Sequence, residues 1–166
     1  MTVSELPVVD FEALFQSQYA RLARVVYRVI GDTARAEEIA ADVFVRFREK
    51  PPADGNAAGW LHRTAMRLAF DALRRDRISE RNAPRLVGVG DARDDVEREE
   101  SRRRVRATLA AIRPERSELL ILRSEGYSYA EIAAMTGTSA ASIGTYISRA
   151  EEDFRKEYEQ RYGQLG

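Results

Sequence analysis

Cysteine is absent from this chain of 166 residues, and His62 is its only histidine. Without cysteine there are no disulfide bonds and no thiolate metal sites, and one histidine gives a histidine–carboxylate metal site little to build on. No stretch approaches the roughly 18 apolar residues of a membrane span, and the N-terminus lacks a basic start followed by an apolar run. We therefore expect no signal peptide, no membrane insertion, no metal or other cofactor, and a cytoplasmic location.

The charges of the chain balance overall but are unevenly distributed. The 27 lysines and arginines equal the 27 aspartates and glutamates, whereas DNA-binding proteins usually carry a basic excess. Residues 1–78 and 102–166 are each slightly basic, and the segment between them is acidic. We therefore expect two weakly basic folded parts joined by an acidic linker, and weak DNA binding by the isolated protein.

Apolar residues recur at helical spacing through most of the chain, and no segment of any length shows the alternation of a strand. The pattern predicts helices over 11–30, 33–50, 57–77, 96–112, 114–125 and 129–136, with one more after Ser139. Proline and glycine without a helical period indicate a linker between the third and fourth helices. The expected fold class is all-α, with two small helical domains at 1–78 and 101–166 and a flexible acidic linker at 79–100.

The segment Tyr127–Ala150 has the pattern of two short helices joined by a glycine turn. Ser128 and Glu131 have the spacing of a capping box, which starts a helix that ends at Gly137, and Ser139 offers the N-cap of the next helix. This is helix-turn-helix geometry, which points to DNA. A helical hairpin that only forms a core is the alternative.

Three stretches resemble the two characteristic regions of the extracytoplasmic-function sigma factors, the short two-domain class of the sigma-70 family. They are GDTARAEEIAADVFVRFREK, GWLHRTAMRLAFDALRRDR and IRPERSELLILRSEGYSYAEIAAMTGTSAASIGTYISRA, in that order. The resemblance covers roughly residues 10–78 and 100–158. It implies a subunit that binds bacterial RNA polymerase core, with the first domain opening the minus-10 promoter element and the second holding the minus-35 element. An anti-sigma factor is a further candidate partner.

The helix expected at 33–50 carries the candidate polymerase-binding residues. Its charged residues are spaced three to five positions apart, so they share much of one face, which suits a basic helical partner. The resemblance assigns this face to core binding, through Glu37, Glu38, Asp42, Phe44 and Arg46. The family usually has Gln-Glu where this chain has Ala41-Asp42, so part of the polar contact is replaced. A merely solvated face is the alternative.

The loop that follows and the helix at 57–77 resemble the part of the family that captures a flipped minus-10 base. Strand opening needs a pocket for the unstacked base and cations for the phosphates. The candidate minus-10 residues are Asn56, His62, Arg63, Arg67, Arg74 and Arg75. We expect Asn56 to bond a base edge, His62 to lie at the surface, and Trp60 to belong to the core. Arg67 stands where the family commonly has asparagine, which makes one detail of the strand contact differ.

The candidate minus-35 surface is poor in positive charge. The family's recognition helix commonly carries a lysine and an arginine in a pattern like Val-Lys-Ser-Arg-Leu, where this chain reads Ile-Gly-Thr-Tyr-Ile over 143–147. The candidate contacts are Ser139, Ser142, Gly144, Thr145, Tyr146, Ser148 and Arg149. We expect recognition through DNA shape and small polar contacts, with most of the affinity supplied by polymerase.

Two other classes of protein compete with the sigma-factor interpretation. A sigma-like regulator that binds DNA without starting transcription fits the missing cations but not the polymerase-facing helix. An enzyme is not expected, because the chain has no glycine-rich phosphate loop and His62 has no serine–acid companions in a recognisable arrangement. Transcription that depends on core polymerase separates the sigma factor from both.

Overall fold

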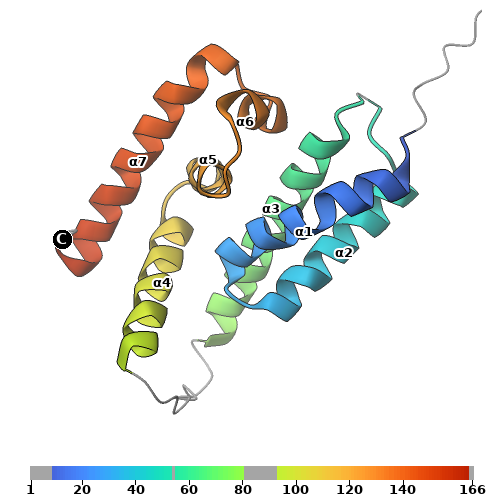
Figure 1. Ribbon diagram of the computed structural model, residues 1–166. Coiled ribbons are helices and arrows are strands. Elements are labelled where there is room, and N and C mark those ends of the chain that lie inside the picture. Colours follow the sequence, from blue (N-terminus) through green and yellow to red (C-terminus); the bar gives the residue numbers. More distant parts are fainter. Residues whose placement is uncertain (1–8, 54, 81–92, 165–166) are drawn as a thin grey trace, which may run out of the picture.

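The structure is a computed structural model that describes residues 9–53, 55–80 and 93–164, and all regular structure in these ranges is helical. The helices are α1 (Phe11–Ile30), α2 (Thr33–Glu49), α3 (Ala57–Glu80), α4 (Arg93–Ala111), α5 (Pro114–Ser124), α6 (Tyr129–Thr136) and α7 (Ala140–Tyr162). Figure 1 shows them in two groups, α1–α3 and α4–α7. The expected all-α, two-domain architecture is confirmed.

Capping residues set both ends of α1 and the start of α2 in the α1–α3 bundle. The side chain of Asp10 accepts a hydrogen bond of 3.2 Å from Ala13 N, and that of Asp32 accepts one of 3.1 Å from Arg35 N. Gly31 ends α1 at φ 74°, in the left-handed region that glycine enters at little cost. The buried core of the bundle includes Leu22, Val25, Val26, Ala40, Val43, Phe44, Leu61, Ala65 and Ala69.

The α4–α7 domain buries the apolar faces of its helices around α5. Pro114 occupies the first turn of α5, where its missing N–H costs nothing. Two buried hydroxyls are paired with backbone, since Thr108 Oγ1 donates to Arg104 O at 2.8 Å and Ser117 Oγ donates to Leu109 O. The buried side chains include Leu119, Ile121, Leu122, Ile132, Ile143 and Ile147.

Residues 93–95 are helical, although the hydrophobic pattern predicted that the fourth helix begins at residue 96. α4 thus begins three residues before the expected start, α3 extends to Glu80, and residues 81–92 of the expected linker lie outside the described residues. Residues 95–103 of α4 are all exposed and form no apolar stripe, so hydrophobic periodicity does not reveal the start of this helix. Ion pairs support them instead, among them Arg104–Glu100 at 3.3 Å and Arg102–Glu99 at 3.8 Å.

The two domains pack against each other, and their buried apolar residues form one continuous cluster. α3 contacts α6, and α1 contacts both α4 and α5. In Figure 1, α6 accordingly lies near the beginning of α3. Within the described ranges, no helix combines the length and apolar character needed to cross a membrane.

Candidate functional site

The outer face of α2 presents the expected charged residues to solvent. Glu37, Glu38, Asp42 and Arg46 are all exposed, and Arg46 Nε lies 3.0 Å from Asp42 Oδ2 one turn away. Phe44 instead points inward and is only 2% exposed, so it supports this face from beneath. The structure therefore brings four of the five candidate polymerase contacts together on one accessible surface.

An apolar groove beside that face was not found from the sequence. It has a volume of about 600 Å³ and is lined by Phe11, Phe15, Ala41, Phe44, Val45, Arg48 and Glu49. The Phe15 ring meets the Phe44 ring edge-on at 5.0 Å between centroids and stacks on Tyr19 at 4.8 Å. Val45 is 54% exposed, and such a valine on the solvated side of an amphipathic helix was the signal available in the sequence.

Asn56 and Arg63, expected to meet minus-10 DNA, are bound to the second domain. Asn56 Nδ2 donates to Ala134 O at 2.9 Å, and Arg63 Nη1 donates to Met135 O at 2.9 Å. Both carbonyls belong to the last turn of α6, where backbone oxygens lack partners within the helix and carry partial negative charge. The first domain thus caps α6 from outside, and in this arrangement α6 engages one N–H donor of each of these two side chains.

His62 is fully buried, so its expected surface position is wrong. Its ring meets Tyr127 edge-on at 5.4 Å between centroids, and its Nε2 lies 3.4 Å from the Tyr127 hydroxyl oxygen. Burial and the nearby Arg21 guanidinium lower the pKa of His62 from 6.5 to about 4, so the ring is neutral near pH 7. The helical pattern placed His62 on α3 but could not show its burial, because Tyr127, which packs against the ring, belongs to the other domain.

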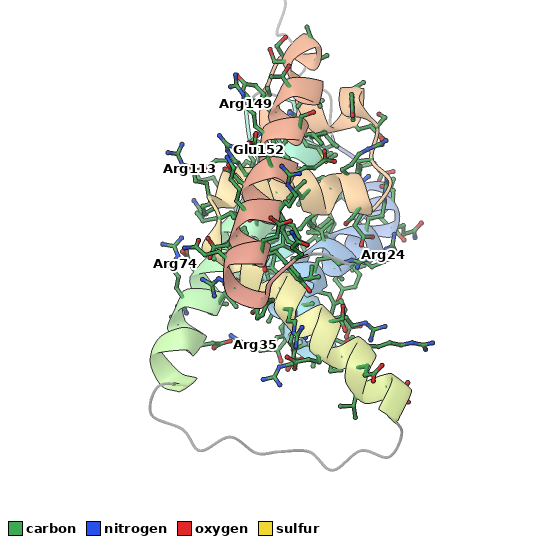
Figure 2. All side chains as sticks on the ribbon, turned by 90° about the vertical axis from the view of Figure 1, so that its left-hand side faces the viewer. Arg24, Arg35, Arg74, Arg113, Arg149 and Glu152 are labelled. Carbon is green, nitrogen blue, oxygen red and sulfur yellow. The ribbon has the colours of Figure 1, made fainter. Side chains whose placement is uncertain are left out.

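The remaining candidate cations of α3 face outward. Arg67, Arg74 and Arg75 are exposed, and Arg74 Nη2 lies 3.5 Å from Asp71 Oδ1. Trp60 is partly buried and meets Phe47 edge-on at 5.6 Å between ring centroids, which agrees with its expected core role. Figure 2 places Arg74 on the same edge of the molecule as Arg113 and Arg149 of the second domain.

The helix-turn-helix forms as the motif predicted. Ser128 N donates to Glu131 Oε2 at 2.7 Å, and Glu131 N donates to Ser128 Oγ at 3.1 Å, which completes the capping box. Gly137 then ends α6 at φ 69°. Ser139 is the N-cap residue of α7, but its side chain makes no capping hydrogen bond, so its hydroxyl is available to other groups.

The candidate minus-35 residues lie along the first half of α7. Ser139, Thr145, Tyr146, Ser148 and Arg149 are exposed, and Ser142 and Gly144 are partly buried. A Cβ added at Gly144 would lie 3.6 Å from Tyr129 Cε2, an ordinary contact, so packing inside the chain does not require glycine there. Figure 2 shows Arg149 and Glu152 near one another on this helix, which leaves the surface mixed in charge.

Two further titratable groups lie between the domains and were missed from the sequence. Burial raises the pKa of Glu118 from 4.5 to about 7, with Arg63 opposing the rise and Glu115 adding to it. Glu125 binds two arginines of α1, at 2.7 Å from Arg28 Nε and 3.4 Å from Arg24 Nε. No group of three or more potential metal ligands occurs in the residues that the structure describes.

Known families account for both domains. The family described as "Sigma-70 region 2" matches residues 14–78, and the family described as "Sigma-70, region 4" matches residues 102–153. Together with the helix-turn-helix and the exposed face of α2, these matches show that the chain belongs to the sigma-70 family, as an extracytoplasmic-function sigma factor.

Individual relatives agree with this assignment. The chain is 31% identical over 157 residues to the ECF RNA polymerase sigma factor SigJ of Mycobacterium tuberculosis, covering 87% of this chain and 49% of SigJ. It is 27% identical over 160 residues to the ECF RNA polymerase sigma factor SigE of Mycolicibacterium smegmatis, covering 88% of this chain and 60% of SigE. The chain therefore spans about half to three fifths of the length of these two relatives.

A solved structure shares the fold. It is the sigma factor RpoE from Bartonella quintana in a complex with the anti-sigma factor NepR, with a TM-score of 0.54 and 17% sequence identity. The similarity covers 90% of this chain and 97% of RpoE. At this identity the comparison concerns the fold alone.

Proposed function

We propose that this chain binds the core of bacterial RNA polymerase and directs it to promoters. The first domain contacts core through α2 and reads the minus-10 element, while the second domain holds the minus-35 element through α7. The family assignment supports these roles. Bacterial RNA polymerase and the chromosome are in the cytoplasm, so we propose the same location for this protein. No catalytic group of its own is needed, because the polymerase performs the chemistry.

One observation supports this function best: the polymerase-facing surface is free, whereas part of the minus-10 surface is occupied. Glu38 and Asp42 are exposed on α2, while Asn56 and Arg63 donate hydrogen bonds to the end of α6. A factor built in this way docks on polymerase through α2, and separation of its domains in the holoenzyme exposes its DNA-reading residues. This order suits a subunit that acts in a holoenzyme rather than alone.

The experiment is run-off transcription with purified core polymerase on a library of genomic fragments. Addition of the protein should produce discrete transcripts that core alone does not make, and mapping their starts identifies the promoters. Absence of both core binding and new transcripts on every fragment would remove the proposed function.

A second candidate is a sigma-like regulator that occupies promoter DNA without starting transcription. It is favoured by Gly144 and Tyr146, which stand where the family commonly has cations. Selective DNA binding by the protein alone, combined with no effect on core polymerase, would establish this alternative. An anti-sigma factor is a further partner that we propose, and stabilisation of the closed domain pair would give it a means of inhibition.

A further inference from the structure

A cleft opens between the two domains, on the side where α1 faces α4 and α5. Its volume is about 710 Å³, and α1, α4, α5 and α7 all contribute to its walls. The apolar part of the lining consists of Tyr27, Val105, Leu109, Leu120, Ile121 and Phe154. Because both domains contribute, a molecule in this cleft contacts the two domains together.

The polar part of the lining is dominated by arginine. Arg24 and Arg28 come from α1, and Arg102 and Arg106 come from α4. Glu125 lies between the two α1 arginines, and Glu99 pairs with Arg106 at 2.9 Å and with Arg102 at 3.8 Å. These four guanidinium groups and two carboxylates together carry a net charge of two positive units. Figure 2 shows Arg24 at the edge of the molecule where α1 meets α4.

The size and polarity of the cleft favour a small molecule. Ligand pockets commonly have volumes of roughly 300–1,000 Å³, mainly apolar walls and a few charged groups, and they occur preferentially between domains. We propose that the cleft binds a small amphipathic organic anion, with its carboxylate or sulfonate at the arginine rim and its aliphatic or aromatic body against the apolar wall.

Such a ligand would hold the domains in the closed arrangement described above. Closure keeps Asn56 and Arg63 bonded to α6, so ligand binding opposes promoter opening. This regulatory consequence rests on the proposed function, whereas ligand binding itself does not depend on it. The two are therefore tested in separate experiments.

Binding is measured on the full-length protein without polymerase, by titration with the fluorescent anion 8-anilinonaphthalene-1-sulfonate. We expect one site per chain and displacement of the dye by decanoate. Decanol, with the same chain length but no charge, should displace the dye about tenfold less well, because it loses a charge-assisted hydrogen bond.

Matched variants on α4 locate the site. Val105→Glu puts a carboxylate on the exposed part of the apolar wall and should weaken decanoate binding at least about tenfold. The new carboxylate repels the anion, and it would have to lose its hydration when the aliphatic chain covers it. Val96→Glu adds the same charge to an exposed position of the same helix outside the cleft and should leave binding unchanged. Arg102→Ala should weaken binding, and Arg103→Ala, also exposed but outside the lining, should not.

Equal binding by the Val105→Glu and Val96→Glu variants would overturn the proposed site. Equal displacement by decanol and decanoate would overturn the proposed anionic ligand. The regulatory arm adds saturating decanoate to the transcription assay, where promoter-specific transcripts should fall for the unmodified protein and persist for Val105→Glu. If the dye binds as expected but the protein never supports transcription, the binding site stands and the proposed function fails.

Discussion

His62 makes the contact between the domains sensitive to acid, because it is buried as a neutral ring. The groups facing it are Tyr127 and the Arg21 guanidinium, which lies 4.3 Å from the Tyr127 ring centroid. The pKa of His62 is about 4 in this structure against 6.5 when free, so above pH 6.5 both forms are neutral and pH has no effect. As pH falls from 6.5 to 4, His62 takes up a proton in the unfolded or opened form first. This stabilises that form by roughly 3 kcal/mol relative to the closed, folded form.

Glu118 has the opposite pH dependence. Its pKa is raised from 4.5 to about 7, so the folded form holds the proton more tightly and its contribution is complete below pH 4.5 and lost as pH rises through 7. When the pH falls from 7 to 5, His62 therefore lowers the free energy of unfolding by about 2 kcal/mol and Glu118 raises it by about the same amount. A weak net pH dependence of the whole protein would conceal both.

Single substitutions should separate these two contributions. We compare the change in free energy of unfolding when the pH is lowered from near 7 to near 5. Relative to the unmodified protein, this change should be about 2 kcal/mol more favourable for His62→Gln and about 2 kcal/mol less favourable for Glu118→Gln. Urea denaturation at the two pH values measures both changes, and the comparison between pH values cancels the packing cost of each substitution. Parallel profiles for all three proteins would show that neither group is buried as the structure has it.

Gly144 is a second residue whose environment allows a direct prediction. Glycine inside a helix costs about 0.5–1 kcal/mol relative to alanine, and a Cβ here meets only an ordinary contact of 3.6 Å with Tyr129. Gly144→Ala should therefore raise the free energy of unfolding by about 0.5–1 kcal/mol, measured by urea denaturation. A loss of stability would mean that α7 packs more tightly than the structure shows.

At the scale of elements, α2 is the proposed polymerase-binding helix. Glu38→Lys with Asp42→Lys reverses charge on its exposed face, so the affinity for core should fall about tenfold or more while circular dichroism stays unchanged. The matched control is Asp95→Lys with Glu97→Lys, which makes the same charge change on exposed positions of α4. Equal core affinity in the two double variants would place the interface on another element.

The recognition helix α7 gives a prediction about DNA. Gly144→Lys with Tyr146→Arg adds two cations to its accessible half, so non-specific affinity should rise and the slope of log K against log salt should steepen by about two units. Promoter selectivity should decrease, because phosphate contacts favour all sequences alike. Salt titrations on promoter and scrambled duplexes measure both effects. Nanomolar, sequence-selective binding by the unmodified protein at physiological salt would contradict the expected weak DNA binding by α7.

At the scale of the whole molecule, the sequence predicted what depends on neighbouring residues and missed what depends on distant ones. The Ser128–Glu131 box and Gly137 correctly predicted the two ends of α6, because caps act over three or four positions. The burial of His62 and the pairing of Glu125 with α1 arise between domains, and no local pattern encodes them. The helices that carry the candidate residues form where the sequence predicted them, but the contacts that Asn56 and Arg63 make with α6 were not foreseen.

The closed arrangement of the domains is held in part by Glu125, which accepts both α1 arginines while only 10% of its side chain is exposed. The arginines are more than half exposed, so we assign the cluster only about 1 kcal/mol, equivalent to about a fivefold change in the ratio of closed to open forms. Glu125→Gln removes the charge at nearly constant shape and should shift that ratio toward the open form. Glu151→Gln neutralises an exposed carboxylate of α7 and serves as the control.

The absence of cysteine makes this shift measurable at chosen positions. Fluorophores on Ala34→Cys of α2 and Gln160→Cys of α7, both exposed, report the separation of the domains by energy transfer. Glu125→Gln should lower the transfer efficiency, because a larger fraction of the protein is open. It should also raise the apparent affinity for core polymerase by the factor by which the closed-to-open ratio changes, about fivefold, because less free energy is spent on opening. Lower transfer without tighter core binding would mean that core accepts the closed form, and opening would then belong to the promoter step.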